Sequence, residues 1–124
     1  MNKKETQTIF VTGAAGFIGA AFCQKLLRNG VKVIAIDNLN KYYDPKFKKL
    51  RLKNIERSLY FEKSLWHFYE GSLEDYDLLE EIFNKNNPKI VVNLAAQAGV
   101  RFSIDNPSAY VNSNLVGFAN ILEL

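Results

Sequence analysis

The sequence is poor in the features that mark several classes of protein. Its single cysteine, Cys23, cannot form a disulfide within the chain, and it falls in an apolar helical stripe that predicts a small buried hydrophobe. No apolar run approaches the roughly 20 residues of a membrane span, and the first residues show no signal-peptide pattern. We therefore expect a cytoplasmic protein with no membrane partner.

Motifs that would indicate a metal site or a nucleic-acid site are also lacking. The one histidine, His67, lies inside an expected strand, which favours a structural or surface role over ligation or catalysis, and we expect no metal site. Residues 41–63 carry eight Lys or Arg against three Asp or Glu. A basic segment can bind nucleic acid or an anionic ligand, but no base-stacking or groove-reading motif accompanies this one. A solvated helix face is the preferred interpretation, and no nucleic-acid partner is expected.

What the sequence does contain is an alternation of strand-like and helix-like segments. The 124 residues, 48% hydrophobic and 23% charged, are typical of one globular domain. Strands are expected at 9–12, 31–36, 65–69 and 90–94. The expected helices have these apolar stripes: 17–27; Phe47, Leu50, Ile55 and Leu59; Leu78, Leu79, Ile82 and Phe83; Val111, Leu115, Phe118 and Leu122.

Several residues predict where these helices start and stop. Asn29-Gly30 and Asn86-Asn87-Pro88 are stop signals, whereas Asp44-Pro45 and Asp105-Asn106-Pro107 are start signals. Ser72, three residues before Asp75, also resembles a start signal.

Strands and helices that alternate in this way predict an α/β fold with a parallel sheet and right-handed crossovers. The expected architecture is the first half of a Rossmann-type doubly wound sheet with strand order 3-2-1-4. Ligands of such sheets bind at the carboxyl ends of the strands, where the strand order reverses. We therefore expect a crevice between the first and fourth strands.

Three glycines follow the first strand with the spacing G-x-x-G-x-x-G, and an apolar helix follows them. Gly13 permits a tight turn, Gly16 lets the backbone approach a diphosphate, and Gly19 allows helix and strand to pack closely. Free N–H groups and the positive end of the helix dipole converge there. The pattern therefore predicts dinucleotide binding rather than a merely structural turn.

An acidic residue ends the second strand, eighteen positions after Gly19. At that place Asp37 can accept hydrogen bonds from a ribose 2′-hydroxyl, and its charge would repel a 2′-phosphate. The predicted cofactor is therefore NAD rather than NADP.

The residues after the fourth strand leave alternatives open. Ala95 and Ala96 fit close packing and room for a cofactor equally well. Arg101 is either a surface arginine or a contact for an anionic substrate at the crevice. Asn114, on the apolar side of the last helix, is expected to be a buried amide that ties the helix to nearby backbone.

Tyr42 and Lys46 form a Tyr-x-x-x-Lys pattern, which is the acid–base pair of short-chain dehydrogenases. Pro45 starts a helix between them, however, and the pair follows the second strand, far from its usual place in the chain. We do not assign it a catalytic role.

These motifs together resemble a known family. Val11 to Gly19, Asp37-Asn38-Leu39 and Leu94 to Gln97 are similar to the extended short-chain dehydrogenases, the NAD-dependent epimerase/dehydratase family. The strings DNLNKYYDP (37–45), AAQAGVRFS (95–103) and YVNSNLVGF (110–118) resemble the UDP-glucuronate 4-epimerases in that family.

The resemblance implies a set of site residues. Gly13, Gly16, Phe17, Ile18 and Gly19 would lie at the diphosphate, Asp37 and Asn38 at the adenosine ribose, and Ser72 and Leu73 at the adenine. Leu94, Ala95, Ala96 and Gln97 would border the nicotinamide half, with Ser113 near its ribose. Arg101 and Ser103 would contact the substrate.

The resemblance also implies an activity. The family's epimerases move hydride from C4 of a hexose to NAD and return it to the other face of a 4-keto intermediate. A nucleotide sugar such as UDP-glucuronate would be the substrate, and the whole protein would be a homodimer. The alternatives are a nucleotide-sugar 4,6-dehydratase, another 4-epimerase of the family, or a non-catalytic nucleotide-binding module.

The sequence departs from the family pattern in three places. Ser72 stands where an aspartate usually accepts from the adenine amino group, and Asn93 replaces a frequent histidine. The family's Ser/Thr and its true Tyr-x-x-x-Lys would follow Leu124. We therefore expect residues 1–124 to be the N-terminal part of an NAD-binding Rossmann domain, with cofactor-binding residues, no catalytic residue and an open edge at the fourth strand.

Overall fold

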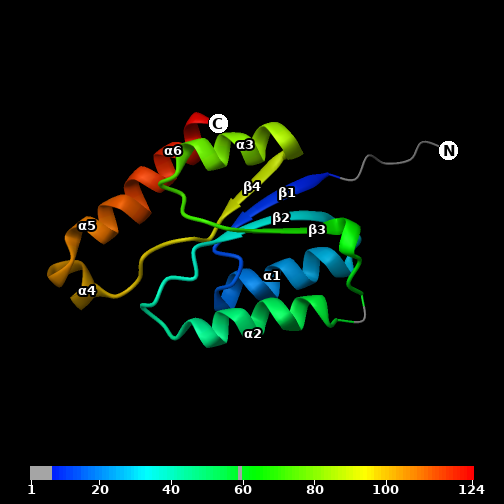
Figure 1. The fold of residues 1–124 in the computed structure, drawn as a ribbon, viewed down its shortest axis with the longest axis horizontal. Helices are drawn as coiled ribbons and strands as arrows, with labels where there is room; N and C mark the ends of the chain where they lie inside the picture. Colours follow the sequence, from blue (N-terminus) through cyan, green and yellow to red (C-terminus); the bar gives the residue numbers. More distant parts are fainter. Residues whose placement is uncertain (1–6, 59) are drawn as a thin grey trace.

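The computed structural model describes residues 7–58 and 60–124, which form one parallel sheet between two layers of helices (Figure 1). The strand order is β3-β2-β1-β4, as the sequence predicts. Every neighbouring pair is parallel, with Val11 of β1 opposite Ala35 of β2 and Val92 of β4. The strands are β1 Thr8–Thr12, β2 Lys32–Asp37, β3 Trp66–Glu70 and β4 Ile90–Asn93.

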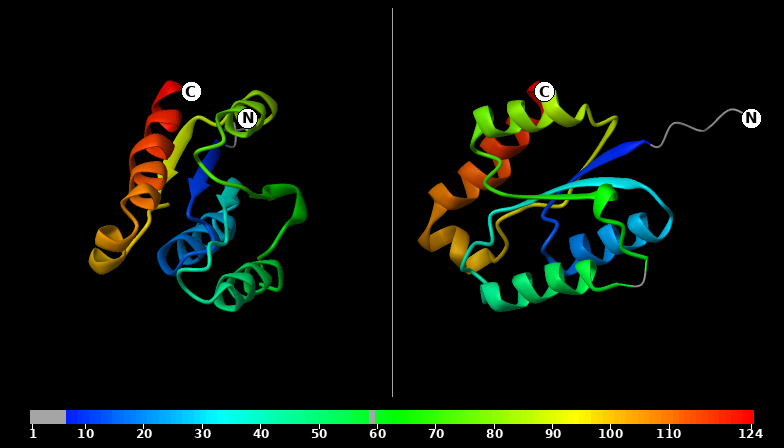
Figure 2. Two further views of the ribbon diagram at one scale, coloured as in Figure 1. Left: turned by 60° about the vertical axis from the view of Figure 1, so that its left-hand side comes forward. Right: turned by 45° about the vertical axis from the view of Figure 1, so that its right-hand side comes forward.

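The helices divide between the two faces of the sheet. One face is covered by α1 and α2, and the other by α3 and α6, an arrangement that all views show (Figures 1 and 2). The helices are α1 Phe17–Arg28, α2 Pro45–Glu56, α3 Tyr76–Asn86, α4 Val100–Asp105, α5 Pro107–Tyr110 and α6 Gly117–Glu123. A 3₁₀ turn covers Lys63–Leu65, and a π-helical segment, Val111–Val116, joins α5 to α6.

Alternation along β1 produces two hydrophobic cores. Val11 points to the α1 and α2 side, where it packs in one cluster with Cys23, Ile55 and Trp66. Phe10 points to the other side and packs with the helical residues of α3 in a second cluster. The sheet is therefore covered on both faces, as parallel sheets require.

Most of the predicted helix boundaries are confirmed. The Asp44 side chain accepts from Lys46 N at 2.9 Å at the start of α2, and Asn87 ends α3 in the left-handed conformation with φ +45°. The prediction for Ser72 is wrong, because α3 begins after Asp75, whose carboxylate accepts from Leu78 N at 3.1 Å. Ser72 belongs to the preceding turn, where its carbonyl accepts from Asp75 N.

Two of the predicted apolar stripes do not face the core. In α2, Phe47 and Leu50 are 61% and 50% exposed and only Ile55 is buried, because the first turns of this helix border a cavity rather than the sheet. Leu59 lies outside the described residues. The last helix turns Gly117 and Ile121 inward. Its predicted stripe is therefore exposed: Val111, Leu115, Phe118 and Leu122.

Two further expectations need correction. Phe17 and Ile18, at the start of α1, are 82% and 68% exposed and do not pack on the sheet. Residues 99–103 lie outside every helix expected from the sequence but are mostly helical, since α4 begins at Val100 after Gly99 with φ +99°. No helix in the described ranges has the length and apolar character that a membrane crossing needs.

Candidate functional site

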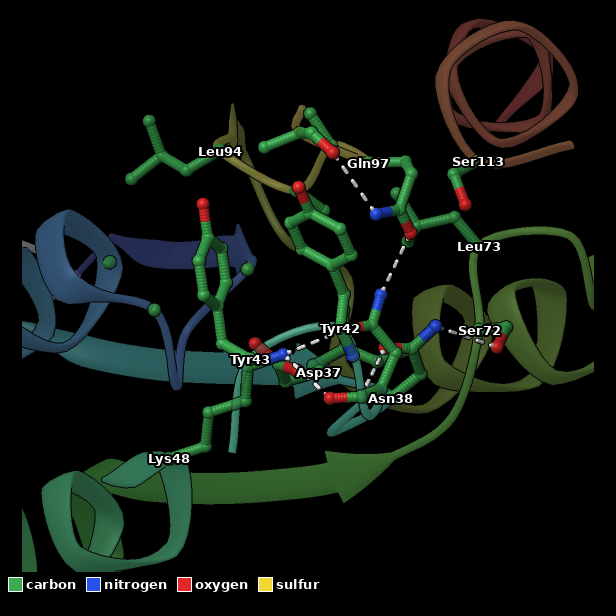
Figure 3. Close-up of a pocket in the computed structure, with 18 of the residues that line it drawn as sticks. Asp37, Asn38, Tyr42, Tyr43, Lys48, Ser72, Leu73, Leu94, Gln97 and Ser113 are labelled. Carbon is green, nitrogen blue, oxygen red and sulfur yellow. Dashed lines mark hydrogen bonds between the residues drawn. The ribbon is translucent and has the colours of Figure 1, made fainter. Parts of the chain in front are cut away.

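A cavity of about 760 Å³ lies at the carboxyl ends of β1, β2 and β4, where the strand order reverses (Figure 3). Its size is in the range of small-molecule and cofactor sites. It is lined by Gly13, Gly16, Phe17, Ile18, Gly19, Ile36, Asp37, Asn38, Asn40, Tyr42, Tyr43, Asp44, Phe47, Lys48, Arg51, Gly71, Ser72, Leu73, Glu74, Leu94, Ala95, Ala96, Gln97, Ala98 and Ser113.

The glycine turn forms the floor of this cavity. Gly13 has φ +67°, and a Cβ there would lie 2.7 Å from Ala95 N, so that only glycine lets the turn approach the loop after β4. Gly19 sits against the turn itself, since a Cβ there would lie 2.0 Å from Gly13 O. The first intrahelical bond of α1 is Ala20 N to Gly16 O, which leaves the preceding N–H groups without helical acceptors. These groups make the turn an anion-binding end of a helix.

A buried hydroxyl fixes the loop after β4. Thr12 is fully buried, and its Oγ1 accepts from Leu94 N at 3.0 Å and Ala95 N at 3.1 Å. The same hydroxyl donates to Asn93 Oδ1 at 2.5 Å. Asn93 therefore completes the bonds of a hydroxyl that orients the cavity wall, which gives a physical role to a residue that the sequence leaves unexplained.

The acidic residue that ends β2 is buried at the cavity wall. Asp37 is 9% exposed, and its Oδ2 accepts from Ala15 N at 3.0 Å while its Oδ1 accepts from Leu39 N at 2.8 Å. Each carboxylate oxygen can accept a second bond. Asp37 therefore joins the glycine turn to the loop after β2 and still offers acceptors to a ligand.

A chain of hydrogen bonds connects the loops around the cavity (Figure 3). Asn38 Nδ2 donates to Ser72 Oγ at 3.3 Å, and its Oδ1 accepts from Asn40 N at 3.1 Å. Asn40 Nδ2 donates to Gln97 Oε1 at 3.1 Å, and its Oδ1 accepts from Lys48 Nζ at 3.1 Å. Side chains from the β2, β3 and β4 loops and from α2 are thus linked through one polar network.

Aromatic side chains form the outer wall. The Tyr42 ring lies 4.8 Å from that of Tyr43 and 4.9 Å from that of Phe102, centroid to centroid. Tyr110 donates to Gly99 O and places its ring 6.4 Å from Phe102. Tyr42 therefore lines the cavity as an aromatic wall, whereas Lys46, its partner in the Tyr-x-x-x-Lys pattern, does not line it.

The structure brings all fourteen predicted cofactor residues to this one cavity: Gly13, Gly16, Phe17, Ile18, Gly19, Asp37, Asn38, Ser72, Leu73, Leu94, Ala95, Ala96, Gln97 and Ser113. The two predicted substrate residues are not among its lining residues. Arg101 is exposed on α4, and Ser103 Oγ donates to Val100 O. Contact with a ligand stays a prediction for every one of them.

Sequence reasoning missed several residues of the cavity. Asn40, Tyr43, Phe47, Lys48 and Arg51 line it, and Arg51 Nη1 donates to Ala15 O at 3.2 Å. The signal available was their position, because they follow the acidic residue of β2 within one turn or helix. The sequence instead places Lys48 and Arg51 on an expected solvated helix face and Phe47 in the expected apolar stripe of the same helix.

Other candidate groups have ordinary roles. His67 is exposed on β3, and burial raises the pKa of the Cys23 thiol to about 12, which keeps it protonated and unreactive. Among the residues that the structure describes, no group of three or more His, Cys, Asp or Glu is placed to hold a metal ion.

Comparison with known proteins gives a consistent result. The family described as GDP-mannose 4,6 dehydratase matches residues 10–124. Protein CapI of Staphylococcus aureus is 49% identical over 93% of this chain and 33% of its own length. UDP-glucuronate 4-epimerase 4 of Arabidopsis thaliana is 46% identical over 94% of this chain and 25% of its own.

A solved structure agrees with these relatives. The UDP-glucuronic acid 4-epimerase of Bacillus cereus, in complex with UDP-glucuronic acid and NAD, superposes with a TM-score of 0.79 and 31% identity. It matches 94% of this chain and 35% of that one. The chain spans between a quarter and a third of the length of the curated relatives named above. Since the family match covers nearly all of it, the chain belongs to the family of NAD-dependent epimerases and dehydratases that includes GDP-mannose 4,6 dehydratase.

Proposed function

We propose that this chain binds NAD and forms the cofactor-binding part of a nucleotide-sugar 4-epimerase. The main supporting observation is that a glycine turn, the N-terminus of α1 and a buried acidic residue meet in one cavity at the switch point of the sheet. Two positions of this turn require glycine, because a Cβ on Gly13 or Gly19 would lie within 2.7 Å of backbone atoms and displace the turn.

The lining residues would divide the cofactor among them. The diphosphate would lie against Gly16 and at the N–H groups of Phe17 and Ile18, and Asp37 would accept from the adenosine ribose. Ser72 and Leu73 would border the adenine, with Ser72 already bonded to Asn38. The loop from Leu94 to Gln97, with Ser113, would border the nicotinamide half.

When bound, NAD supplies a hydride acceptor that later returns the hydride. The residues of this chain bind and orient it. Thr12 holds the β4 loop, and the side chains of Phe17, Ile18 and Leu94 contribute apolar surface to the cavity wall. We assign proton transfer to no residue of this chain.

We infer that the substrate is UDP-glucuronate. The support is the set of UDP-glucuronate 4-epimerases among the relatives and the strings around Tyr42 and Arg101. Arg101, at the start of α4, would meet the negative charge of the sugar or the diphosphate, and Ser103 lies two residues farther along the same helix. A nucleotide-sugar 4,6-dehydratase is the second candidate, because the matching family description is that of a dehydratase. A non-catalytic nucleotide-binding module is the third.

We also infer a homodimer in the cytoplasm for the whole protein. The exposed apolar side chains on the last helix, Leu115, Phe118 and Leu122, support an interface there.

Isothermal calorimetry with NAD and NADP tests the cofactor assignment. The wild-type chain should prefer NAD by at least about tenfold, or about 1.4 kcal/mol, because the 2′-phosphate would meet the Asp37 carboxylate. Asp37→Asn should narrow this preference, whereas Glu81→Gln, on α3 away from the cavity, should leave it unchanged. Equal affinity of the wild type for both dinucleotides would contradict the assignment.

A further inference from the structure

The π-helical segment Val111–Val116 and α6 form one continuous helical stretch, here called the last helix. This helix contacts two separate loops of the cavity through two asparagines. Asn114 Oδ1 accepts from Gln97 N at 2.7 Å, and Asn114 Nδ2 donates to Gln97 O at 3.2 Å. Six residues along the helix, Asn120 Nδ2 donates to Leu73 O at 2.8 Å. Gln97 and Leu73 line the cavity from the loops that follow β4 and β3 respectively. One helix thus binds the backbone on both sides of the site.

The side of the helix between the two asparagines is shaped for this contact. Gly117 is buried there, and a Cβ on it would lie 2.8 Å from Leu73 Cβ. Asn114, Gly117 and Asn120 all contact the loops of the cavity, so the three lie on the same side of this helical stretch. The glycine lets the helix approach close enough for Asn120 to reach a carbonyl.

The local backbone around Asn114 is unusual. Asn114 lies within the π-helical segment Val111–Val116, a form that is rare and often occurs at functional sites. Ser113, its neighbour, lines the cavity, and Figure 3 shows it entering on the side of Gln97 and Leu73. Asn114 itself is not buried, contrary to the expectation from sequence, although it makes the expected bonds to backbone.

These bonds provide partners for backbone groups of Gln97 and Leu73, which lie outside the sheet. Gln97 is only 6% exposed, and a single side chain pairs both its N–H and its C=O. Leu73 is 8% exposed, and Asn120 pairs its carbonyl. Because a buried polar backbone group without a partner costs free energy, removing either asparagine should release the loop that it holds.

We propose that Asn120 and Asn114 are positioning residues for the two ends of the cofactor site. Asn120 fixes Leu73, at the adenine end, and Asn114 fixes Gln97, at the nicotinamide end. This assignment rests on the proposed binding of NAD in the cavity. It implies that the two asparagines act on different halves of one ligand although they lie on the same helix.

Binding of NAD and of adenosine 5′-monophosphate, a probe of the adenine end alone, separates the two roles. Asn120→Ala should lower the affinity for both ligands by the same factor, about fivefold for one lost hydrogen bond. Asn114→Ala should weaken NAD by about fivefold or more and change the affinity for the monophosphate by less than about twofold. Asn112→Ala, exposed on the same helix, is the matched control and should change neither affinity.

A conservative variant and a measurement without ligand complete the test. Asn114→Asp keeps the acceptor for Gln97 N–H and loses the donor, so its NAD affinity should fall between those of wild type and Asn114→Ala. Amide hydrogen exchange should accelerate at Gln97 in Asn114→Ala but not in Asn112→Ala.

Two results overturn the proposal in distinguishable ways. The division of roles is wrong if the wild type binds NAD and both alanine variants lose affinity for both ligands by the same factor. It is also wrong if neither variant loses affinity for either ligand. If the wild type binds no NAD, the proposed function fails and this assignment fails with it.

Discussion

Replacing Gly19 with alanine gives the sharpest test of how α1 meets the glycine turn. An alanine Cβ at this position would lie 2.0 Å from Gly13 O and 2.8 Å from Gly13 C, whereas ordinary contacts begin near 3.4 Å. The obstructing atoms are backbone and cannot rotate away. Helix and turn must therefore separate, and the groups that would hold a diphosphate separate with them.

Two opposing terms set the magnitude. Overpacking typically costs 1–3 kcal/mol, and the backbone obstruction places Gly19→Ala at about 3 kcal/mol. The higher helix propensity of alanine offsets about 1 kcal/mol of this destabilisation. The net loss of unfolding free energy should be about 2 kcal/mol, or a fall of about 8 °C in Tm for a chain of this size.

Thermal and urea unfolding, each followed by NAD titration, measure this effect. Gly30→Ala, at the other end of α1, is the control: Gly30 has φ +74° and nothing within 4 Å of the added Cβ. Gly30→Ala should therefore lower the unfolding free energy by about 1 kcal/mol, through backbone strain alone. Its affinity for NAD should be unchanged. If Gly19→Ala were as stable as wild type and bound NAD equally well, the close approach of helix and turn would have no energetic importance.

Two further substitutions test buried side chains, one beside the cavity and one in the hydrophobic core. Thr12→Val keeps the side-chain shape but removes the acceptor of Ala95 N, one of the two acceptors of Leu94 N and the donor to Asn93 Oδ1. Urea unfolding should therefore show a loss of about 2 kcal/mol, and a loss below about 0.5 kcal/mol would contradict the role of this hydroxyl. Burial raises the pKa of Cys23 from 9.0 to about 12, so the folded state holds its proton more tightly than the unfolded state, and stability should fall as pH rises from 9 toward 12. Cys23→Ala should show a shallower decline over that range, and an equal decline would show that other groups cause it.

The sequence predicts the sheet well because its signals are local and mutually consistent. β-branched runs such as residues 31–36 and 90–94 have few alternatives to a buried strand, and the alternation with helices restricts the topology to very few choices. The glycine turn and Asp37 were predictable for the same reason, since their roles follow from backbone freedom and from position at a strand end.

The remaining features depend on contacts between distant segments. Whether Phe47 packs in a core or lines a cavity depends on where α2 lies, and no stripe within the helix determines this. The orientation of the last helix is similar: its bulky residues suggested a buried face, whereas the small Gly117 makes the close contact. The link from Asn40 to Gln97 joins residues 57 apart, and a single sequence contains no signal for such a pair.

The pairing of β1 with β4 has a consequence for how the molecule folds. Val11 pairs with Val92, and Thr12 bonds to Asn93 across 81 residues, whereas β1, α1 and β2 are contiguous in the chain. Closing so long a loop costs more entropy than forming local contacts, and contacts of this kind slow folding. We therefore expect the half of the cavity built from residues 13–51 to form early. The wall from Leu94 to Gln97 should form late, so a ligand that binds both halves would find its complete site only after the last strand has joined the sheet.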